Sequence, residues 1–386
     1  MDHPYLYDLS PLFWLKAIGI LVALGPLVWV WYRGRHMSTA GRLGLLTGVT
    51  LFFTIDLILF GVFTRLTDSG LGCPDWPGCF GKVSPIGAHD YIAAAQASFP
   101  LGPVTFPKAW IEMIHRYLAT GVGVMILVLA FWSWREREQT HVSVFWPIVT
   151  LIWVCIQGAF GALTVTMKLF PAIVTMHLLG GMILLALLRL QGVRYKMGHV
   201  PGGLSLPLLS IQPGTRRWLW VVFAAVWVQM ALGGWVSTNY AALACRDFPT
   251  CQGSWWPYMD FSAGFQLWRE LGMQRSGDSI PFEALTAIHF THRLGAYVVF
   301  TLFVYLAWRF WRVEGKASHA WILLGLIAWQ ALSGVSIVLR EWPILIALSH
   351  SGGAAAMVFV LTGWLTAAYP ARAPKAKTSR VSVVSA

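Results

Sequence analysis

The strongest constraint on the fold of this chain is an internal duplication, in which one hydrophobic unit with the same order of marker residues occurs twice. Each copy has a leading glycine, a pair of cysteines, a histidine followed by arginine, a glutamine with a glycine, and a last histidine with a glycine. The markers are Gly61, Cys73, Cys79, His115, Arg116, Gln157, Gly161, His177 and Gly180 in the first copy and Gly233, Cys245, Cys251, His292, Arg293, Gln330, Gly334, His350 and Gly353 in the second. The offset between the copies stays within about 172 to 177 residues, which indicates duplication of a whole structural unit.

The composition places both copies in a membrane. Hydrophobic residues make up 57% of the 386 residues, charged residues make up 11%, and the mean hydropathy is +0.62. A chain this apolar cannot form a soluble surface. Apolar runs of about 20 residues, the length that crosses the hydrocarbon core, are predicted at 11–32, 43–64, 110–133, 144–166, 171–191, 217–238, 287–311, 318–338 and 344–369. The predicted fold class is an all-α integral membrane protein with two tandem, pseudo-symmetric four-helix bundles and one extra N-terminal transmembrane helix.

Basic residues predict the orientation of these spans, because basic loops are retained in the cytoplasm. Every second connection and the C-terminal tail are basic, through Arg33, Arg35, Arg42, Arg135, Arg137, Arg189, Arg194, Lys196, Arg216, Arg217, Arg309, Arg312, Lys316, Arg372, Lys375, Lys377 and Arg380. We therefore expect a multi-pass protein of the bacterial cell (inner) membrane, with the N-terminus and both cysteine loops outside and the C-terminus in the cytoplasm. The net charge of +12 reflects this topology and contact with membrane lipid, and not nucleic-acid binding.

The same pattern predicts the division of the chain. Residues 1–42 are expected to form the extra helix and a basic loop, and residues 43–191 the first four-helix bundle. Residues 192–216 form a cytoplasmic linker, residues 217–369 the second bundle, and residues 370–386 a disordered cytoplasmic tail. Duplicated membrane proteins of this kind usually place their sites within or between the two halves.

Four histidines are the first candidates for a site. His115, His177, His292 and His350 each fall about five or six residues after the start of a predicted span, which at ~1.5 Å per residue is one common depth of roughly 8 Å. Each half then presents two facing imidazoles, the geometry that binds a haem iron from both sides. A lone histidine on an apolar helix is more often a hydrogen-bonded core residue, but four at a matched depth favour ligation of haem iron.

Two arginines and one carboxylate accompany the histidines. Arg116 and Arg293 directly follow His115 and His292, so their guanidinium groups suit haem propionates, the alternative being an interfacial position without a ligand. Three residues before each of these histidines, the first copy has Glu112 and the second has His289. A carboxylate this close to the membrane interior is a functional candidate that can move protons, although a structural hydrogen bond is the alternative. His289 is expected to be an accessory polar contact.

The chain has five cysteines, of which Cys155 lies in an apolar span. The other four form the loop pairs Cys73–Cys79 and Cys245–Cys251, and a disulfide within each loop is permitted on the outer side of a bacterial membrane. Such a bond either staples a long loop or, in the first loop, is redox-active. The spacing alone does not decide between these two roles.

Taken together, these residues resemble the haem A synthase family. The resemblance is carried by residues 64–79 (TRLTDSGLGCPDWPGC), 112–116 (EMIHR), 177–181 (HLLGG), 289–293 (HFTHR) and 350–353 (HSGG), and it spans about residues 61–368. Members of this family commonly have eight spans, so the first helix of this chain is additional.

The resemblance implies an activity and a role for each half. It implies that the first half, with His115, His177 and Glu112, holds haem O and oxidises its C8 methyl group to the formyl group of haem A for terminal oxidase assembly. It implies that the second half, with His292 and His350, holds a haem b that passes electrons onward. It also implies that Cys73 and Cys79 take part in electron transfer. The assignment of each haem to its half rests on the resemblance alone.

Two other classes of protein use the same residues. A non-catalytic dihaem b-type cytochrome would relay electrons to or from quinone through the four histidines, and the Glu112 asymmetry disfavours it. A disulfide-exchange protein would use the loop cysteines, and the matched histidines disfavour it. The expected partners are haem O, the haem O synthase that delivers it, an electron acceptor of unidentified nature and a second copy of the chain.

Overall fold

A computed structural model describes residues 10–100, 102–140, 143–197 and 208–369 of the chain. Within these residues, nine helices are long and apolar enough to cross a membrane, which confirms the predicted fold class. They are α1 (Ser10–Gly34), α2 (Thr39–Leu66), α4 (Phe106–Arg135), α6 (Phe145–Thr166), α7 (Pro171–Met197), α8 (Pro213–Thr238), α10 (Phe282–Arg312), α11 (Ala317–Leu339) and α12 (Ile344–Ala367). Four short helices lie between them: α3 (His89–Ser98), α5 (Arg137–Thr140), η1 (Ala241–Leu243) and α9 (Phe261–Gly264).

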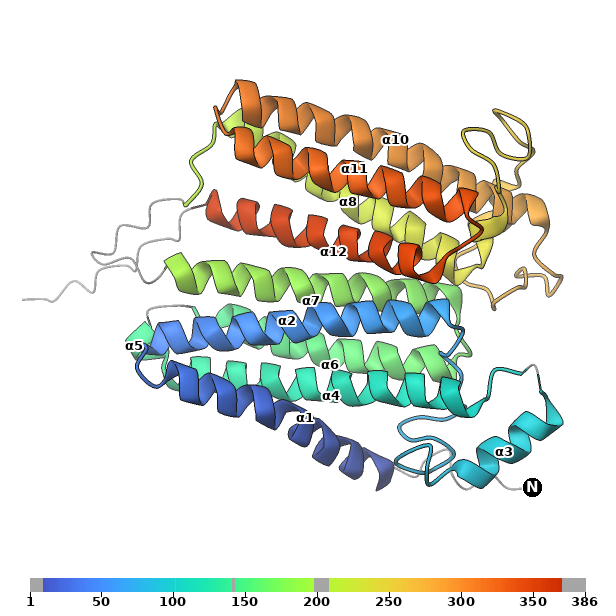
Figure 1. Cartoon of the computed structure of the whole chain (residues 1–386), viewed down its shortest axis with the longest axis horizontal. Coiled ribbons are helices and arrows are strands. Elements are labelled where there is room, and N and C mark those ends of the chain that lie inside the picture. Colours follow the sequence, from blue (N-terminus) through green and yellow to red (C-terminus); the bar gives the residue numbers. More distant parts are fainter. Residues whose placement is uncertain (1–9, 101, 141–142, 198–207, 370–386) are drawn as a thin grey trace, which may run out of the picture.

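The long helices lie side by side in two groups, with α1 to α7 below and α8 to α12 above in Figure 1. In the first group α4 packs on α2 and α6, and α7 packs on α2 and α6. In the second group α10 packs on α8 and α11, and α12 packs on α8 and α11. The groups meet where α7 contacts α8 and α12. Both cysteine-bearing loops emerge at the same end of the bundle, at the right of Figure 1, which we call the cysteine-loop end.

Contacts between the groups show how the two copies are related. Arg65 Nη2 donates to Ser237 O at 2.6 Å, and Tyr240 Oη donates to Asp68 Oδ1 at 2.6 Å. Both pairs join residues 172 positions apart, which are equivalent positions of the two copies. Because equivalent positions meet and α2 and α8 run in the same direction, the halves are parallel repeats about an axis along the helices.

Several helices extend beyond the predicted spans, because the helix continues into polar residues that a hydropathy criterion excludes. α4 begins at Phe106 rather than 110, and Thr105 caps it by accepting from Lys108 N at 3.4 Å. α10 begins at Phe282 rather than 287, directly after Pro281. α7 continues through residues 192–197, which we expected in the linker. The predicted tail, 370–386, lies outside the described residues.

Candidate functional site

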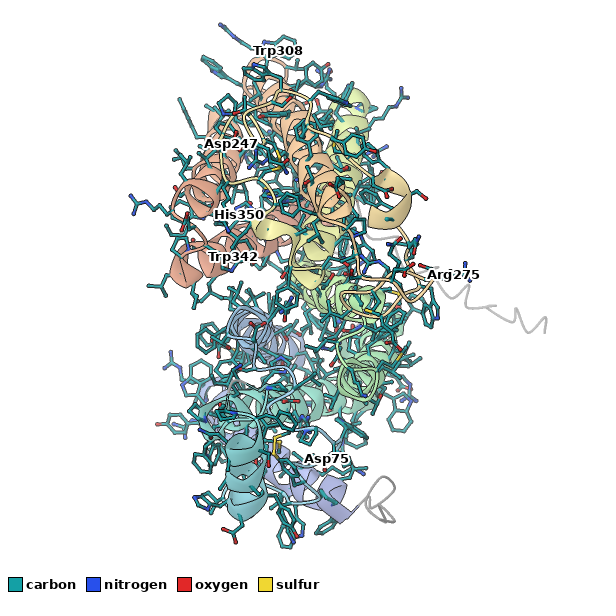
Figure 2. The ribbon with its side chains drawn as sticks, turned by 90° about the vertical axis from the view of Figure 1, so that its right-hand side faces the viewer. Asp75, Asp247, Arg275, Trp308, Trp342 and His350 are labelled. Atoms are coloured by element: carbon teal, nitrogen blue, oxygen red, sulfur yellow. A yellow bond between two sulfur atoms is a disulfide. The ribbon has the colours of Figure 1, made fainter. Side chains whose placement is uncertain are left out.

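The four histidines form two pairs, one in each half. His115 on α4 is near enough to His177 on α7 to interact with it electrostatically, and His292 on α10 is likewise near His350 on α12. Figure 2 looks at the cysteine-loop end of the molecule, where His350 lies among the helices of the second half. One pair thus joins the third and fifth spanning helices, and the other joins the seventh and ninth.

Each imidazole lies against a glycine of a neighbouring helix. A Cβ atom added at Gly61 would lie 2.9 Å from His115 Nε2, and one at Gly233 would lie 2.9 Å from His292 Cε1. The other two histidines have the same arrangement, with 3.5 Å from Gly161 to His177 Cε1 and 3.3 Å from Gly334 to His350 Cε1. These four glycines are markers of the duplication; an added Cβ would crowd the ring at Gly61 and Gly233, be slightly tight at Gly334 and make an ordinary contact at Gly161.

The polar surroundings of the rings differ between the halves. In the second half, Gln229 Nε2 lies 3.0 Å from His292 Nδ1, and Ser333 Oγ lies 2.8 Å from His350 Nδ1. In the first half, the buried Nδ1 of His177 has no hydrogen-bond partner among the described residues. The His115 ring instead stacks on Phe60, with ring centroids 6.4 Å apart. A hydrogen bond on one ring nitrogen fixes the orientation of a metal-binding histidine, so the second half holds its rings more firmly.

The paired imidazoles suit haem better than a bare metal ion. In the described part of the chain, no group of three or more His, Cys, Asp or Glu side chains is placed to hold a metal ion. A haem needs only two axial ligands, because the macrocycle supplies the others. Each half offers two imidazoles between apolar helices, with a glycine against each ring, so the donor set of each half fits the two axial positions of a haem.

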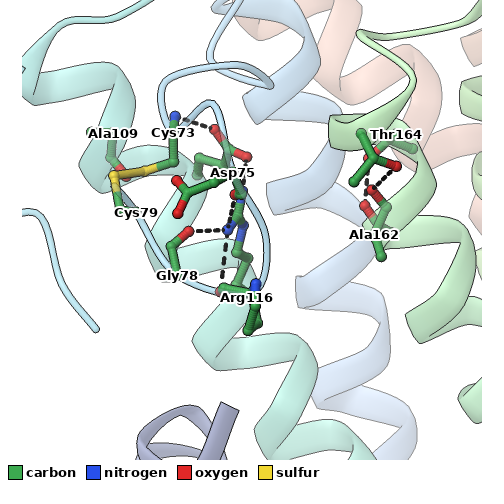
Figure 3. Close-up of polar contacts among 12 residues, drawn as sticks. Cys73, Asp75, Gly78, Cys79, Ala109, Arg116, Ala162 and Thr164 are labelled. Atoms are coloured by element: carbon green, nitrogen blue, oxygen red, sulfur yellow. Dashed lines mark hydrogen bonds and ion pairs between the residues drawn. A yellow bond between two sulfur atoms is a disulfide. The ribbon is translucent and has the colours of Figure 1, made fainter. Parts of the chain in front are cut away.

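The first cysteine loop is closed by the Cys73–Cys79 disulfide, which confirms that predicted pairing. The Asp75 carboxylate accepts the N–H groups of Phe80 and Gly81 at 2.6 and 2.7 Å. Both residues have positive φ, of 49° and 67°, and the carboxylate satisfies the N–H groups that this turn leaves free. Figure 3 shows the loop folded over Arg116, whose Nη1 donates to the carbonyl oxygens of Asp75, Pro77 and Gly78.

The second loop repeats this construction around the Cys245–Cys251 disulfide. The Asp247 carboxylate accepts the N–H groups of Gln252 and Gly253, and Arg293 donates to the carbonyl oxygens of Asp247, Thr250 and Cys245. The hydroxyl of Thr250 lowers the pKa of Asp247 to about 2, with further lowering by these N–H groups and an opposing effect of burial. Figure 2 shows Asp75 and Asp247 at corresponding places in the two halves.

The two arginines therefore fasten the loops. Arg116 Nη1 donates to loop carbonyls and its Nη2 donates to Glu112. Both terminal nitrogens of Arg293 donate to loop carbonyls. Propionate binding by these arginines stays a prediction, and the contacts in the structure give them a different role. Arginine suits that role because its planar fork reaches several carbonyl oxygens at once.

Glu112 marks the main chemical difference between the halves. Its side chain is buried, with 4% of the residue exposed, and it lies one helical turn before His115. Oε2 accepts from the backbone N–H of Cys73 at 2.8 Å, and Oε1 accepts from Arg116 Nη2. His289 occupies the corresponding position of the second half, buried and with Nδ1 unpaired among the described residues. In the described part of the chain, a carboxylate on a spanning helix thus accepts from the N–H of a loop cysteine only in the first half.

Sequence reasoning missed the residues that hold the rings of the second half. Gln229 precedes Gly233 by one helical turn and therefore lies on the same face of α8. That spacing is a signal for a polar side chain aimed at His292. Ser333, beside Gly334, gives the same signal for His350. Neither residue has an equivalent of its own type in the first copy, where the corresponding positions are Leu57 and Phe160.

Comparisons with known proteins show the family of this chain. The family profile described as "Cytochrome oxidase assembly protein" matches residues 44–362. The haem A synthase of Shewanella oneidensis is 36% identical over 83% of this chain and 94% of its own length. The haem A synthases of Halalkalibacterium halodurans and Chelativorans sp. are 26% and 29% identical, over 80% and 83% of this chain and 90% and 87% of their own lengths. The extent of the profile match and the identity to the Shewanella protein establish that this chain belongs to the cytochrome oxidase assembly protein family that contains the haem A synthases.

Proposed function

We propose that this chain is a haem A synthase that oxidises the C8 methyl group of haem O to the formyl group of haem A. Two relatives that bear the name of that enzyme align with this chain over 94% and 90% of their own lengths. The observation that carries the proposal is an asymmetry within the duplication. Both halves have a histidine pair with glycine neighbours, but among the described residues a buried carboxylate one helical turn from a paired histidine occurs only in the first half.

The first half is the proposed catalytic half. His115 and His177 bind the iron of haem O, the substrate, which fixes the position of the macrocycle relative to Glu112. Oxidation of a methyl group releases protons, and Glu112 accepts them. Its two carboxylate oxygens are oriented by the Cys73 N–H and by Arg116, so the group does not have to reorganise during the reaction.

The first cysteine loop is the proposed electron path at this site. The Cys73–Cys79 disulfide connects to Glu112 through the backbone N–H of Cys73, so its redox state and the carboxylate position are linked by one hydrogen bond. Reduction of the disulfide would place two electrons and two protons on the cysteines. A structural role for the bond in the second loop is consistent with His289 replacing the carboxylate there.

The second half is the proposed haem b half, with His292 and His350 as iron ligands. A bound haem b supplies one-electron transfer. Gln229 and Ser333 orient the two imidazoles, as expected for a permanently bound group rather than for a substrate that must leave. In the same proposal, the cysteine loops lie outside the bacterial inner membrane and the C-terminal tail lies in the cytoplasm. Delivery of haem O by its synthase and a homo-oligomeric state belong to the same proposal.

The proposal is tested in a host that makes haem O but lacks haem A. Haems are extracted and separated by mass-resolved chromatography, with the wild-type gene, with Glu112→Gln and with Glu138→Gln as a control whose side chain is 87% exposed. Haem A or its hydroxylated precursor is expected with wild type and with Glu138→Gln, and a loss of product of at least about a hundredfold with Glu112→Gln, the scale of a positioned acid–base group.

Two outcomes would contradict the proposal. Wild-type protein that binds only protohaem and leaves haem O untouched would favour the dihaem cytochrome. Full product formation by Glu112→Gln would reduce Glu112 to a structural residue and remove the observation on which the proposal depends.

A further inference from the structure

Helix α1 lies outside the part of the chain that the family shares. The family profile begins at residue 44, ten residues after α1 ends at Gly34. In the structure α1 packs along α4, the helix that carries Glu112, His115 and Arg116. Figure 1 shows α1 at the edge of the first group, next to α4, with the first cysteine loop beside its N-terminal end.

Close packing between small residues joins α1 to α4. A Cβ atom at Gly19 would lie 2.4 Å from Thr120 Cγ2, and one at Gly121 would lie 2.7 Å from Val22 Cγ1. Such small positions let two membrane helices approach closely, which is the main source of attraction between helices in lipid. The α1–α4 contact is therefore a built interface and not a loose association.

The second half lacks this interface. Tyr297 and Val298 of α10 correspond to Thr120 and Gly121, since they follow His292 at the same spacing as those residues follow His115. Tyr297 is 50% exposed and Val298 is 59% exposed. The described helices that pack on α10 are α8, α11 and the short α9 and η1. The surface of α4 is thus adapted to α1, whereas the matching surface of α10 is left open.

The N-terminal end of α1 reaches the first disulfide. Leu15, 4% exposed, belongs to one apolar cluster with Cys73, Cys79 and Met113. Pro11 lies against Gly78, with 3.1 Å between Pro11 Cβ and the Cβ position of that glycine. Gly78 is also the residue whose carbonyl oxygen binds Arg116 at 2.5 Å. Both cysteines are fully buried, and α1 supplies part of the apolar surface that covers them.

We propose that α1 is a cover for the Cys73–Cys79 disulfide, which presses the first loop onto α4 and closes the disulfide to thiols and reductants of the surrounding water. Pro11 and Leu15 act as positioning residues, because they hold the loop whose Cys73 N–H orients Glu112. A partner that exchanges electrons with this disulfide has to approach while α1 moves aside, or to act through the protein interior. The second disulfide is also fully buried and is packed by Phe290 and Met259, but among the described residues no helix equivalent to α1 packs on α10.

The proposal that α1 covers the disulfide depends on the proposed function only in giving Glu112 a role. Its test measures disulfide reduction and not the formation of haem A. Purified full-length protein with bound haem is exposed to a water-soluble phosphine. The phosphine becomes its oxide with oxygen from water, while the disulfide takes up two electrons and two protons to give two thiols. Samples are quenched with an alkylating reagent, and mass spectrometry gives the reduction rate of each disulfide separately.

Gly19→Leu and Gly25→Leu form the matched pair of variants. The new side chain at position 19 collides with Thr120 and drives α1 from α4, whereas nothing lies within 4 Å of a Cβ at position 25 of the same helix. In Gly19→Leu we expect Cys73–Cys79 to be reduced at least about tenfold faster than in wild type, because a buried bond reacts through local opening. Gly25→Leu should match wild type, and Cys245–Cys251 should be unchanged in both.

The rates decide the proposal in each case. Equal reduction of Cys73–Cys79 in Gly19→Leu, Gly25→Leu and wild type overturns it, and so does parallel acceleration of both disulfides. If Gly19→Leu loses the haem absorbance of the second half, Leu15→Ser, which alters only the end of α1 beside the loop, is judged by the same criterion. Failure of the wild-type protein to make haem A would count against the proposed function, whereas the cover is decided by the disulfide reduction rates alone.

Discussion

Replacement of Gly233 by alanine tests the haem ligand role of His292 through a single added methyl group. The new Cβ would lie 2.9 Å from His292 Cε1, which is 0.5 Å short of the 3.4 Å at which ordinary contact begins. The ring cannot retreat freely, because Gln229 holds its Nδ1 at 3.0 Å and a haem bound as proposed would occupy its other nitrogen. Overpacking of this kind costs about 1–3 kcal/mol. Since each 1.4 kcal/mol is a factor of ten, loss of haem from the second half should be about 5- to 150-fold faster.

A graded series makes the assay specific. Gly334→Ala places its Cβ 3.3 Å from His350 Cε1, only 0.1 Å short of ordinary contact, so a small effect is expected. Gly325→Ala is the control, since nothing lies within 4 Å of its Cβ. Alanine also favours a helix over glycine by about 1 kcal/mol, so the control should be as stable as wild type or more so. Haem content is measured from reduced-haem spectra per protein, and the loss rate from transfer to apomyoglobin.

The order of the three variants decides the interpretation. Haem loss should follow Gly233→Ala, then Gly334→Ala, with Gly325→Ala like wild type. Wild-type retention in Gly233→Ala would mean that His292 is free to move and does not ligate the iron. Equal losses in all three variants would point to a general effect on the helices.

Three further predictions follow from the loops and the contact between the halves. Arg116→Lys should lower haem A formation about tenfold or more, with the haem b spectrum kept, because an ammonium group cannot reach three carbonyls and a carboxylate at once; unchanged product yield would contradict this. Asp247→Asn tests the carboxylate whose pKa is lowered to about 2. The ionised carboxylate stabilises the fold fully at pH values above the ordinary pKa of aspartate, and this stabilisation is lost as the pH falls through about 2. The thermal midpoint should therefore be lower than that of wild type by a constant amount near neutral pH, and the difference should shrink below about pH 4, whereas a difference that grows on acidification would refute the sign. Arg65→Lys removes a bond to Ser237 O and stacking on Tyr240 at 4.0 Å, so unfolding in detergent should require about 1–2 kcal/mol less, and an unchanged midpoint would exclude the contact as a stabilising link.

The span pattern could be predicted because hydropathy and helix length are local properties. All nine candidate spans of the described residues were predicted, and the errors occur where helices continue into polar turns, as at Phe106, Phe282 and Met197. A hydropathy window ends at the edge of the apolar run, whereas a helix ends where its backbone is capped. Thr105 shows the difference, since its side-chain cap lies outside the apolar run.

The positions of the four paired histidines could be predicted from the sequence, whereas their surroundings could not, and iron ligation by them stays a proposal. The duplication singled out the histidines, and it also marked Gly61 and Gly233 without indicating that they lie against the rings. A search for residues repeated in both copies does not find those that differ between the copies, so Gln229 and Ser333 were missed. For Arg116, proximity to His115 in sequence suggested a propionate contact, which stays a prediction, and gave no sign of the three loop carbonyls to which the arginine donates.

The sequence by itself determined the membrane class, the number of spans, the duplication, the histidine pairs and the two disulfides, because each depends on composition, on spacing or on residues repeated at one offset. The tertiary structure decided which groups touch. It placed Arg65 against Ser237 across the axis between the halves, Glu112 against the Cys73 N–H, and α1 against the first loop. These contacts join segments far apart in the chain, and no local pattern encodes them. They depend on how the two copies and the added helix pack in three dimensions, where small residues such as Gly19 and Gly121 set the distance of approach.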